Sequence, residues 1–310
     1  MRRCVAVLPL DTFTRTEPIL KTSSEGFRTD IEGGSRGRLG LQLYTVMVPL
    51  EEDFEGTLRS VAEMGYREIE TIGAFGRDPS LVRELLERYG LRSPSQHLVP
   101  GQLYHVFQRF AERRLSQDEV RSLWLEGMAI ENVEPIIEEG IVRARALGQQ
   151  HIVWQIIWPQ QMANRALLDE FCRAMNTAGD LCAKEGFVFS FHNHAIEFNT
   201  VDGSVAYDVI LQNTDPRTVK LEMDVYWARV AKADPIEYFR RSPGRFRQCH
   251  LKDMASDGGI TVPGRGSIDF TAILAAGRRA GIEHYYVEFD RSDDPIGVAR
   301  DSYKYLAELM

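Results

Sequence analysis

Four residues in the second half of this 310-residue chain carry side chains that bind divalent metals. They are His192, Asp224, His250 and Glu288, and each stands near the end of a short segment rich in apolar residues. Two imidazoles and two carboxylates form a mixed donor set that suits Mn²⁺, Co²⁺, Fe²⁺ or Zn²⁺, whereas Ca²⁺ prefers oxygen donors alone. The sequence therefore predicts either a metal site assembled from four segments or a buried network of His–carboxylate ion pairs without metal.

Alternation of residue types indicates how these segments present their polar side chains. In FVFSFHNH, residues 187–194, the phenylalanines occupy one parity, and His192 and His194 occupy the other. The same split separates Asp224 in VKLEMDV and His250 in FRQCHLKD from their apolar neighbours. Because side chains alternate across a strand, we expect the polar set inside a closed sheet and the apolar set toward the covering helices.

Eight segments that resemble strands follow one another from Gly40 onward, and helical patterns separate them. Several helices end in a glycine just before the next strand, such as Gly65 and Gly186, where glycine suits a left-handed closing position. Eight strand–helix units predict the α/β fold of a closed (β/α)₈ TIM barrel, and no GxGxxG or Walker A sequence favours an open nucleotide-binding sheet. The segments are LGLQLYTV, YREIET, LRSPSQHL, HIVWQII, FVFSFHNH, VKLEMDV, FRQCHLKD and HYYVEF.

The chain is predicted to contain an irregular N-terminal extension, residues 1–38, and a single barrel domain, residues 39–310. The extension is polar and rich in Gly and Ser, without a sustained period. A long insertion near residues 100–130 interrupts the barrel after the third strand, on the face where barrel enzymes build their sites. It is expected to be either a partial lid or a separate packing cluster.

Charge and cysteine content restrict the partners of the protein. A formal net charge of −8 without a Lys/Arg-rich run argues against nucleic-acid and membrane partners, so we expect a small molecule and leave homo-oligomer formation open. The four cysteines contain no CxxC pair, which indicates neither a disulfide framework nor a thiolate zinc site and fits a cytoplasmic protein. No export signal is expected, because the start MRRCVAVLPL lacks a clear cleavage site.

Several stretches of the chain, taken in order, resemble the sugar phosphate isomerase/epimerase family of the xylose isomerase-like TIM barrels. That superfamily also includes endonuclease IV-type repair enzymes. The likeness extends from about Gly40 to the C-terminus, and the order of its motifs is specific for the superfamily rather than for one reaction. The matching stretches are LGLQLYTV, DFEGTL, EMGYREIE, PSQH, FHNHAIEF, LEMDVYWA, HLKDM, PGRGSIDF and VEFD.

The resemblance implies one divalent metal ion at the ends of strands five to eight, held by His192, Asp224, His250 and Glu288. Mn²⁺, Co²⁺ or Zn²⁺ is expected first, with Mg²⁺ and Fe²⁺ as alternatives. The chain departs from the family at one ligand position, because similar ketose epimerases carry glutamate where this chain has His192. In those enzymes two glutamates exchange protons on opposite faces of the substrate, so the departure affects the reaction more than the metal site.

Further residues are expected close to the metal. Glu70 and His97 close the second and third strands, where each could bind a substrate hydroxyl, move a proton or cap the barrel rim. Lys252 shares the parity of His250. Its ammonium could neutralise an oxyanion, reach a phosphate, or pair with a carboxylate such as Glu222.

Substrate contacts are expected from residues at the site-facing ends of the motifs. Gln42 and Tyr44 lie in the first matching stretch, and Trp227 follows a strand end where an aromatic ring can stack on a sugar. Arg265 lies in the loop PGRGS near the face where barrels often hold phosphate, although by itself the loop is a turn. Glu197 is expected to support the metal ligands.

The function implied by the resemblance is metal-dependent isomerisation or epimerisation of a sugar, sugar phosphate or keto-polyol through an enediolate. Glu288 is expected to be the base, since the matching glutamate of the resembled epimerases both binds the metal and abstracts the proton. His97, Glu70 or His192 would serve the opposite face. A metal-dependent lyase or dehydratase acting on a keto-sugar or keto-glycoside is the alternative, because loss of a β-substituent can follow the same proton abstraction.

Two other functions stay open on the sequence. An endonuclease IV-like phosphodiesterase would require more metal ligands and a basic groove, whereas this chain has seven histidines and a net charge of −8. A non-catalytic sugar-binding barrel would bind its ligand without exchanging protons, and a fold by itself does not distinguish it from an enzyme.

Overall fold

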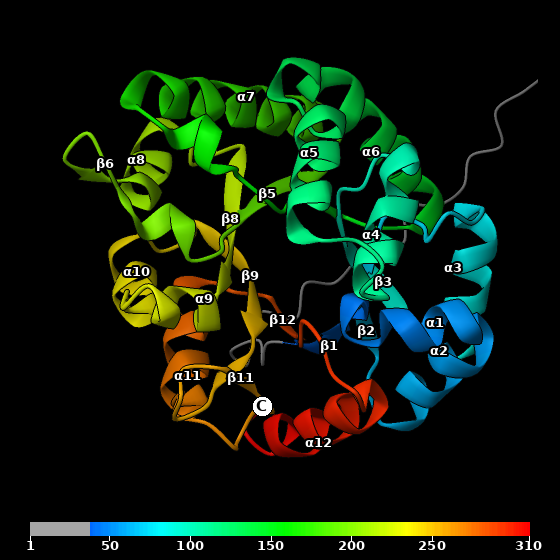
Figure 1. The fold of residues 1–310 in the computed structure, drawn as a ribbon. Helices are drawn as coiled ribbons and strands as arrows, with labels where there is room; N and C mark the ends of the chain where they lie inside the picture. Colours follow the sequence, from blue (N-terminus) through cyan, green and yellow to red (C-terminus); the bar gives the residue numbers. More distant parts are fainter. Residues whose placement is uncertain (1–37) are drawn as a thin grey trace, which may run out of the picture. The chain divides into compact units, whose positions relative to one another are not determined.

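The computed structural model of the protein describes residues 38–310. Most of the predicted N-terminal extension therefore lies outside the described residues, and the first strand begins at Arg38, one residue before the expected boundary. Within residues 38–310, eight parallel strands close into a barrel in the spatial order β1, β12, β9, β8, β5, β4, β3, β2 (Figure 1). The predicted (β/α)₈ barrel is confirmed.

The barrel strands follow the eight predicted segments in order. Their bounds are β1 Arg38–Gln42, β2 Glu68–Ile72, β3 Arg92–His97, β4 His151–Trp154, β5 Val188–His192, β8 Val219–Asp224, β9 Phe246–Leu251 and β12 His284–Val287. Two small antiparallel hairpins lie outside the barrel, formed by β6 Thr200–Val201 with β7 Ser204–Val205 and by β10 Asp253–Met254 with β11 Ile260–Thr261.

Helices surround the barrel as a ring (Figure 1). The α-helices are α1 Met47–Glu52, α2 Phe54–Glu63, α3 Pro79–Arg88, α4 Tyr104–Ala111, α5 Gln117–Gly127, α6 Val133–Leu147, α7 Arg165–Lys184, α8 Ala206–Asn213, α9 Val225–Val230, α10 Pro235–Arg241, α11 Phe270–Ala280 and α12 Pro295–Ala307. Short 3₁₀ helices are η1 Leu43–Val46, η2 Gly101–Leu103, η3 Ile130–Asn132, η4 Pro159–Met162 and η5 Ile196–Phe198. No helix between residues 38 and 310 is long and apolar enough to cross a membrane.

The first predicted strand ends earlier than its sequence suggests. Residues 43–46 of LGLQLYTV form η1 instead of extending β1. The side-chain oxygen of Gln42 accepts a hydrogen bond of 3.1 Å from the backbone N–H of Tyr44, which satisfies a helix-start donor and turns the chain. A side-chain cap therefore overrides the β propensity of Leu43–Val46.

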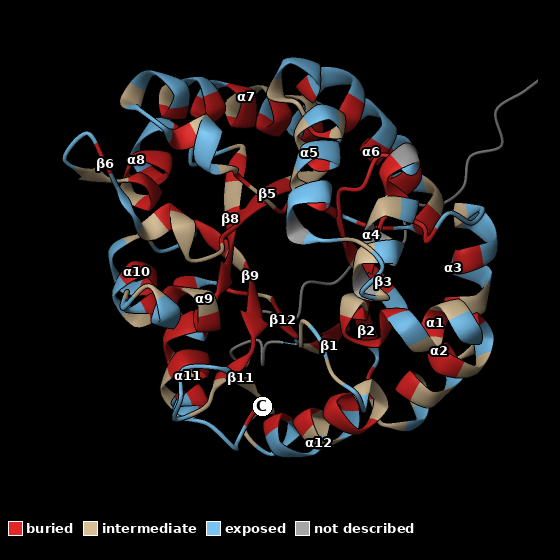
Figure 2. Cartoon of the chain, viewed as in Figure 1, coloured by how far each residue is buried: buried red, intermediate tan, exposed pale blue. Residues whose placement is uncertain are grey.

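Apolar side chains fill the layer between the strands and the helices, where buried residues are concentrated (Figure 2). Phe189, Phe191 and Leu221 belong to this layer, as the alternation predicted. The barrel interior is polar by contrast, and many of its groups form hydrogen bonds with one another. Ser95 donates to Glu70, and the Gln248 amide donates to the hydroxyl of Ser95 at 2.7 Å.

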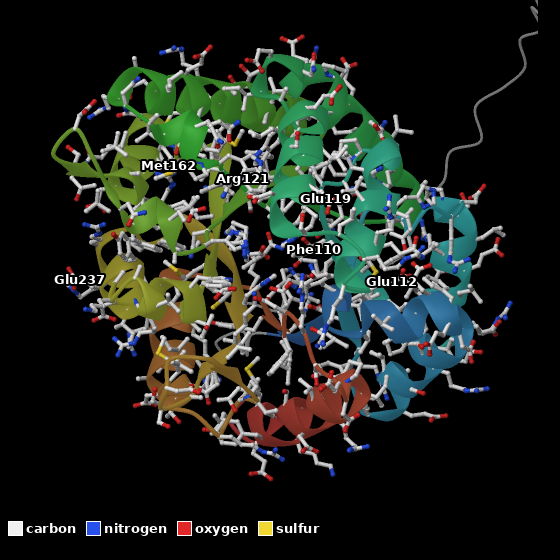
Figure 3. All side chains as sticks on the ribbon, viewed as in Figure 1. Phe110, Glu112, Glu119, Arg121, Met162 and Glu237 are labelled. Atoms are coloured by element: carbon white, nitrogen blue, oxygen red, sulfur yellow. The ribbon has the colours of Figure 1, made fainter. Side chains whose placement is uncertain are left out.

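The insertion between β3 and β4 consists of η2, α4, α5 and η3. Tyr104 and Gln108 of α4 donate hydrogen bonds to Glu51 on α1. Figure 3 labels Phe110 on α4 and Arg121 on α5; the Arg291 guanidinium lies 4.1 Å from the Phe110 ring, and Arg121 lies 5.9 Å from the Trp158 ring. The insertion thus contacts segments that follow β1, β4 and β12. Its function as a lid stays a prediction.

We expect Gly179→Ala to destabilise the protein, although alanine is the better helix former. Gly179 lies inside α7, where an added Cβ would stand 2.8 Å from Cγ2 of Val219 and 2.9 Å from the carbonyl oxygen of Thr218. Relieving that overlap requires α7 to move away from β8, which costs about 1–3 kcal/mol. Urea unfolding measures the loss. The partly exposed neighbour Thr177→Ala is the control and should leave the protein at least as stable, and equal stability of both variants would contradict close packing at Gly179.

Candidate active site

The structure brings the four predicted metal ligands together at the C-terminal end of the barrel. His192 and Asp224 end β5 and β8, His250 is the second-to-last residue of β9, and Glu288 directly follows β12. One nitrogen or oxygen donor from each residue lies within 4.8 Å of the donors of the other three. All four residues are buried, so their charges require a partner or a metal ion.

The positions of the Asp224 and His192 donor atoms indicate that a divalent cation fits this group. Oδ1 of Asp224 accepts the backbone N–H of Trp227 at 3.0 Å, which caps α9, but Oδ2 makes no hydrogen bond. Oδ2 lies 3.9 Å from Nε2 of His192. An imidazole nitrogen and a carboxylate oxygen that also pairs with the Lys252 ammonium thus face each other, as donors to a shared cation do.

Lys252 supplies positive charge at the same place. Its ammonium lies 3.1 Å from Oδ2 of Asp224, 2.8 Å from Oε2 of Glu288 and 2.7 Å from Oδ1 of Asp290. Pairing with a carboxylate was one of the expected roles of Lys252, but its partners are these three and not Glu222, which contacts histidines. Burial lowers the pKa of Lys252, but the three carboxylates outweigh burial and raise it well above its usual range.

Glu288 and Asp224 differ in pKa although they are neighbours. Burial raises the pKa of Glu288, but the charges of Lys252 and His250 are stronger and hold it well below its usual range, so Glu288 is ionised. Burial raises the pKa of Asp224 to about 6 against the opposing charge of Lys252. At neutral pH both carboxylates are therefore mostly ionised and can accept a proton, and Asp224 takes one up at a higher pH than Glu288 when no metal is bound.

A second layer of carboxylates lies beneath the four ligands. Oε2 of Glu222 lies 2.8 Å from Nε2 of His97 and 2.9 Å from Nδ1 of His192. Oε2 of Glu70 lies 2.8 Å from Nε2 of His250, whose Nδ1 lies 2.7 Å from Oε2 of Glu288. These contacts fix the orientation of His192 and His250, which is the usual task of carboxylates behind metal-binding histidines.

The pKa values of the two carboxylates in the second layer, Glu222 and Glu70, shift in opposite directions. Burial raises the pKa of Glu222, but contacts with His250, His97 and His192 lower it well below its usual range. The pKa of Glu70 is raised, first by burial and then by the charge of Glu222. Burial lowers the pKa of His97, yet the charges of Glu70 and Glu222 raise it overall. The ionised Glu222 carboxylate thus favours positive charge on His97 and His250, whereas His192 stays neutral because burial lowers its pKa to about 3.

Glu70 differs from its expected role. It has no exposed surface, and its oxygens meet His250, Gln42, Ser95 and Gln248. No side of Glu70 is left for a substrate hydroxyl. Its contacts make it a positioning residue for His250.

The expected substrate-binding residues divide into two groups. Trp227 is half-buried, and its ring lies 5.7 Å from the Lys252 ammonium and 5.7 Å from the ring of His194. Tyr44 is also half-buried, and burial together with the charges of Asp290 and Glu288 raises its pKa, which places it beside the site. Substrate binding by these two residues stays a prediction.

Gln42 and Arg265 do not reach the site. Gln42 is fully buried and donates to Oε2 of Glu70 at 2.8 Å. Arg265 is exposed and pairs with Asp301 of α12 at 2.7 Å. The loop PGRGS also does not offer its backbone to a phosphate, because the buried carboxylate of Asp253 accepts the N–H groups of Gly264 and Gly266. The predictions that Gln42 and Arg265 contact the substrate and that the loop PGRGS binds a phosphate are therefore wrong.

Asn193 is a site residue that the sequence did not indicate, and Glu222 was expected only as a partner of Lys252. Asn193 joins the ends of β5 and β8, since its side chain donates to the carbonyl oxygen of Asp224 and accepts the N–H of Asp224. Glu222 shares the inward parity of Asp224 two residues away, so alternation could have identified it. For Asn193, on the opposite parity, the sequence held no comparable signal.

Glu197 should give the stability of the protein a pH dependence that Glu197→Gln removes. Burial raises the pKa of Glu197 from 4.5 to about 8, although the backbone N–H of His194 donates to Oε2 at 2.9 Å. The folded protein therefore holds a proton that the unfolded chain releases. This contribution to stability is complete below about pH 4.5 and is lost toward about pH 8, at up to about 1.4 kcal/mol per pH unit.

Urea unfolding of the wild type and Glu197→Gln at about pH 5 and about pH 8 measures this effect. Glutamine has the shape of the protonated acid, so the two proteins should agree at the lower pH and the variant should be the more stable at the higher pH. Parallel pH profiles would show that Glu197 is ionised in the folded protein.

Comparisons with known proteins agree with the barrel fold. The family model described as a xylose isomerase-like TIM barrel matches residues 58–309. The chain is similar to an inosose dehydratase of Geobacillus kaustophilus, 26% identical over 249 residues that cover 70% of this chain and 73% of the relative. An inosose dehydratase of Salmonella agona is 22% identical, over 73% of this chain and 77% of the relative.

A solved structure also superimposes on this protein. It is a sugar phosphate isomerase/epimerase from Parabacteroides distasonis, with a TM-score of 0.72 and 26% sequence identity. The superposition covers 88% of this chain and 98% of the solved one.

Proposed function

Because the chain belongs to the xylose isomerase-like TIM barrel family, we propose that it is a metal-dependent dehydratase of an unphosphorylated keto-polyol or keto-sugar. The observation that carries the proposal is the contact of 2.8 Å between Glu288 and Lys252, a base and an acid at one position. Removal of water requires one group that takes a proton from carbon and one that gives a proton to the leaving hydroxyl. The names of the inosose dehydratases that resemble the chain support this reaction class.

His192, Asp224, His250 and Glu288 would hold the metal ion. When bound, a divalent ion supplies Lewis acidity toward a substrate carbonyl oxygen, which makes the adjacent C–H more acidic. Asp224 and Glu288 each offer oxygen donors, and Glu222 and Glu70 keep the two imidazoles oriented.

The Glu288 carboxylate takes the proton from the carbon beside the carbonyl. The electron pair of that C–H bond moves toward the carbonyl, and its return expels the hydroxyl from the next carbon. Lys252 gives a proton to the departing hydroxyl, so that water leaves. Proton transfer from the Glu288 acid to the Lys252 amine, 2.8 Å apart, restores both groups. The substrate thus loses one H and one OH, and the protein is unchanged.

The strand-five histidine supports elimination over two-base epimerisation. Burial lowers the pKa of His192 to about 3, and Glu222 holds its Nδ1 at 2.9 Å. A neutral imidazole fixed in this way suits a metal ligand better than a proton-exchanging base on the opposite face.

Isomerisation or epimerisation is the second candidate. The similarity to the Parabacteroides distasonis protein favours it. His97, with its raised pKa, would then donate the proton on the second face.

Incubation with keto-polyols and keto-sugars in D₂O, with Mn²⁺, Co²⁺ or Zn²⁺ added, tests the proposal. We expect deuterium beside the carbonyl and a product lighter by one water, which mass spectrometry detects together with the ultraviolet absorbance of an enone. A product of unchanged mass with deuterium incorporated would support the isomerase or epimerase instead. Turnover restricted to phosphorylated substrates would contradict the unphosphorylated substrate class.

A further inference from the structure

A second group of metal-binding side chains lies at the N-terminal end of the barrel, away from the candidate active site. His151 and His284 are the first residues of β4 and β12, and Glu283 directly precedes β12. One donor atom from each of the three lies within 4.8 Å of the other two. Both histidines are almost completely buried, and their rings meet edge to face with centroids 5.1 Å apart.

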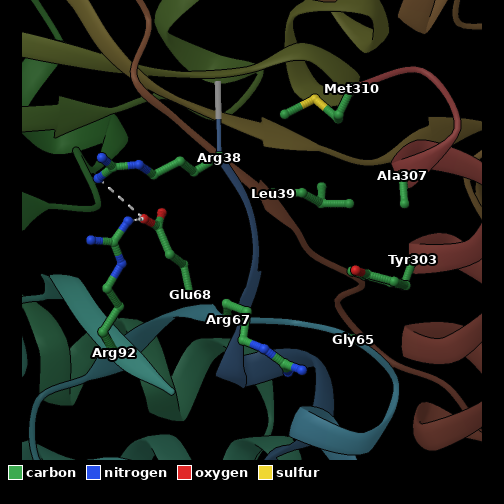
Figure 4. Close-up of a pocket in the computed structure, with 9 residues that line it drawn as sticks. All are labelled: Arg38, Leu39, Gly65, Arg67, Glu68, Arg92, Tyr303, Ala307 and Met310. Atoms are coloured by element: carbon green, nitrogen blue, oxygen red, sulfur yellow. Dashed lines mark hydrogen bonds and ion pairs between the residues drawn. The ribbon is translucent and has the colours of Figure 1, made fainter. Parts of the chain in front are cut away.

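Glu68 sets the orientation of His284. Its Oε2 lies 2.7 Å from Nδ1 of His284, while Oε1 pairs with Arg38 and Arg92 (Figure 4). The Glu68 carboxylate is an acceptor, so Nδ1 of His284 carries the hydrogen. In the neutral ring Nε2 then has a free lone pair. A carboxylate behind a histidine in this way is the common support of a metal-bound imidazole.

His151 offers a second free nitrogen. Its Nδ1 is buried and has no hydrogen-bond partner. Burial, followed by the charges of His284 and Arg247, lowers the pKa of His151 to about 3, so the ring stays neutral and keeps its lone pair. An unpartnered buried nitrogen is costly, and a cation would satisfy it.

We propose that His151, His284 and Glu283 bind a Zn²⁺ ion at the base of the barrel, in addition to the metal of the active site. Two imidazoles and one glutamate form a known zinc donor set, which leaves a fourth position for water. This site does not depend on the proposed reaction, because it shares no residue with Glu288 or its neighbours.

Three arginines oppose the binding of a cation at this place. Arg247 pairs with Oε1 of Glu283, and Arg38 and Arg92 pair with Glu68. Zn²⁺ must therefore share the Glu283 carboxylate with Arg247 or displace it. Removal of that guanidinium in Arg247→Gln should strengthen binding.

Counting Zn²⁺ equivalents in chelator-treated and dialysed protein tests the proposal. The wild type should take up two equivalents per chain, measured by elemental analysis after removal of free metal. His151→Phe should lose one equivalent, and His192→Gln should weaken or lose the other. His284→Gln is a second variant of the site at the N-terminal end of the barrel, in case His151→Phe does not fold. Arg247→Gln should keep two equivalents and show a lower Kd for the one that His151→Phe removes.

Anomalous diffraction at the zinc edge from Zn²⁺-soaked wild-type crystals locates the ion independently of any variant. A peak between His151 and His284 is expected. Equal Zn²⁺ uptake by the wild type, His151→Phe and His284→Gln would overturn the proposal. Diffraction without an anomalous peak at the N-terminal end of the barrel would also overturn it. A substrate panel without turnover would overturn the dehydratase assignment and leave this result unaffected.

Discussion

Glu288→Gln is expected to lower turnover and solvent exchange by about 10²–10⁴-fold, which is the usual contribution of a general base. The amide cannot accept a proton at any useful pKa, and Lys252 loses the ionised partner 2.8 Å from its ammonium. Turnover of the responding keto-polyol and deuterium incorporation in D₂O measure the effect. Metal content must be measured in the same preparation, because Glu288 also belongs to the ligand group.

Asp290→Asn is the matched control for Glu288→Gln. It also removes a carboxylate charge from Lys252, at 2.7 Å, but it lies outside the group of four metal donors. A much smaller loss in Asp290→Asn would separate the function of the base from the charge balance of Lys252. Exchange at the wild-type rate in metal-loaded Glu288→Gln would instead assign the base to His97 or His192.

Glu222→Leu should cause the largest loss of stability, about 3–5 kcal/mol, because it leaves buried charge without its partner. Glu222 lies within 2.8–3.3 Å of nitrogens of His97, His192 and His250. The leucine also releases the Nδ1 of His192, so metal affinity should fall by about 10–100-fold. Urea unfolding and a metal titration of the same protein measure the two effects.

Glu237→Gln is the control at the surface. Glu237 lies on α10 at the edge of the molecule, where it pairs with Arg240 (Figure 3). Its replacement should produce no measurable change in unfolding or metal affinity. Glu222→Leu with wild-type stability would mean that the histidines in contact with Glu222 are neutral and need no carboxylate.

The inward parity of His192, Asp224 and His250 was predictable from the sequence because alternation along a strand is a local property. Each residue lies at or near the end of its strand, where parallel barrel strands place their functional side chains. The same argument identified the eight strands, since each is a short apolar or alternating run bounded by helix ends. Local chemistry was therefore sufficient for the barrel and for the residues that can meet at its C-terminal end.

Gln42 and Glu70 illustrate what local chemistry did not settle. Both have the inward parity and both were expected to face a substrate, yet both are fully buried beneath His250. The depth of an inward side chain depends on the stagger between neighbouring strands, which is a property of the closed barrel and not of any one strand. The prediction that Arg265 contacts the substrate was wrong for a related reason. The Asp253 carboxylate accepts a backbone N–H of the Arg265 loop, and Asp301 of α12 pairs with the Arg265 side chain.

The sequence by itself determined where the eight strands lie along the chain, which side chains point inward and which donor types the site contains, because these follow from periodicity and side-chain chemistry. The tertiary structure decided which carboxylate meets which nitrogen. Lys252 contacts Asp224 and Glu288 instead of Glu222, and Glu222 contacts three histidines. Those pairings, and the protonation states that they impose, depend on distances across the barrel that only closure of all eight strands fixes.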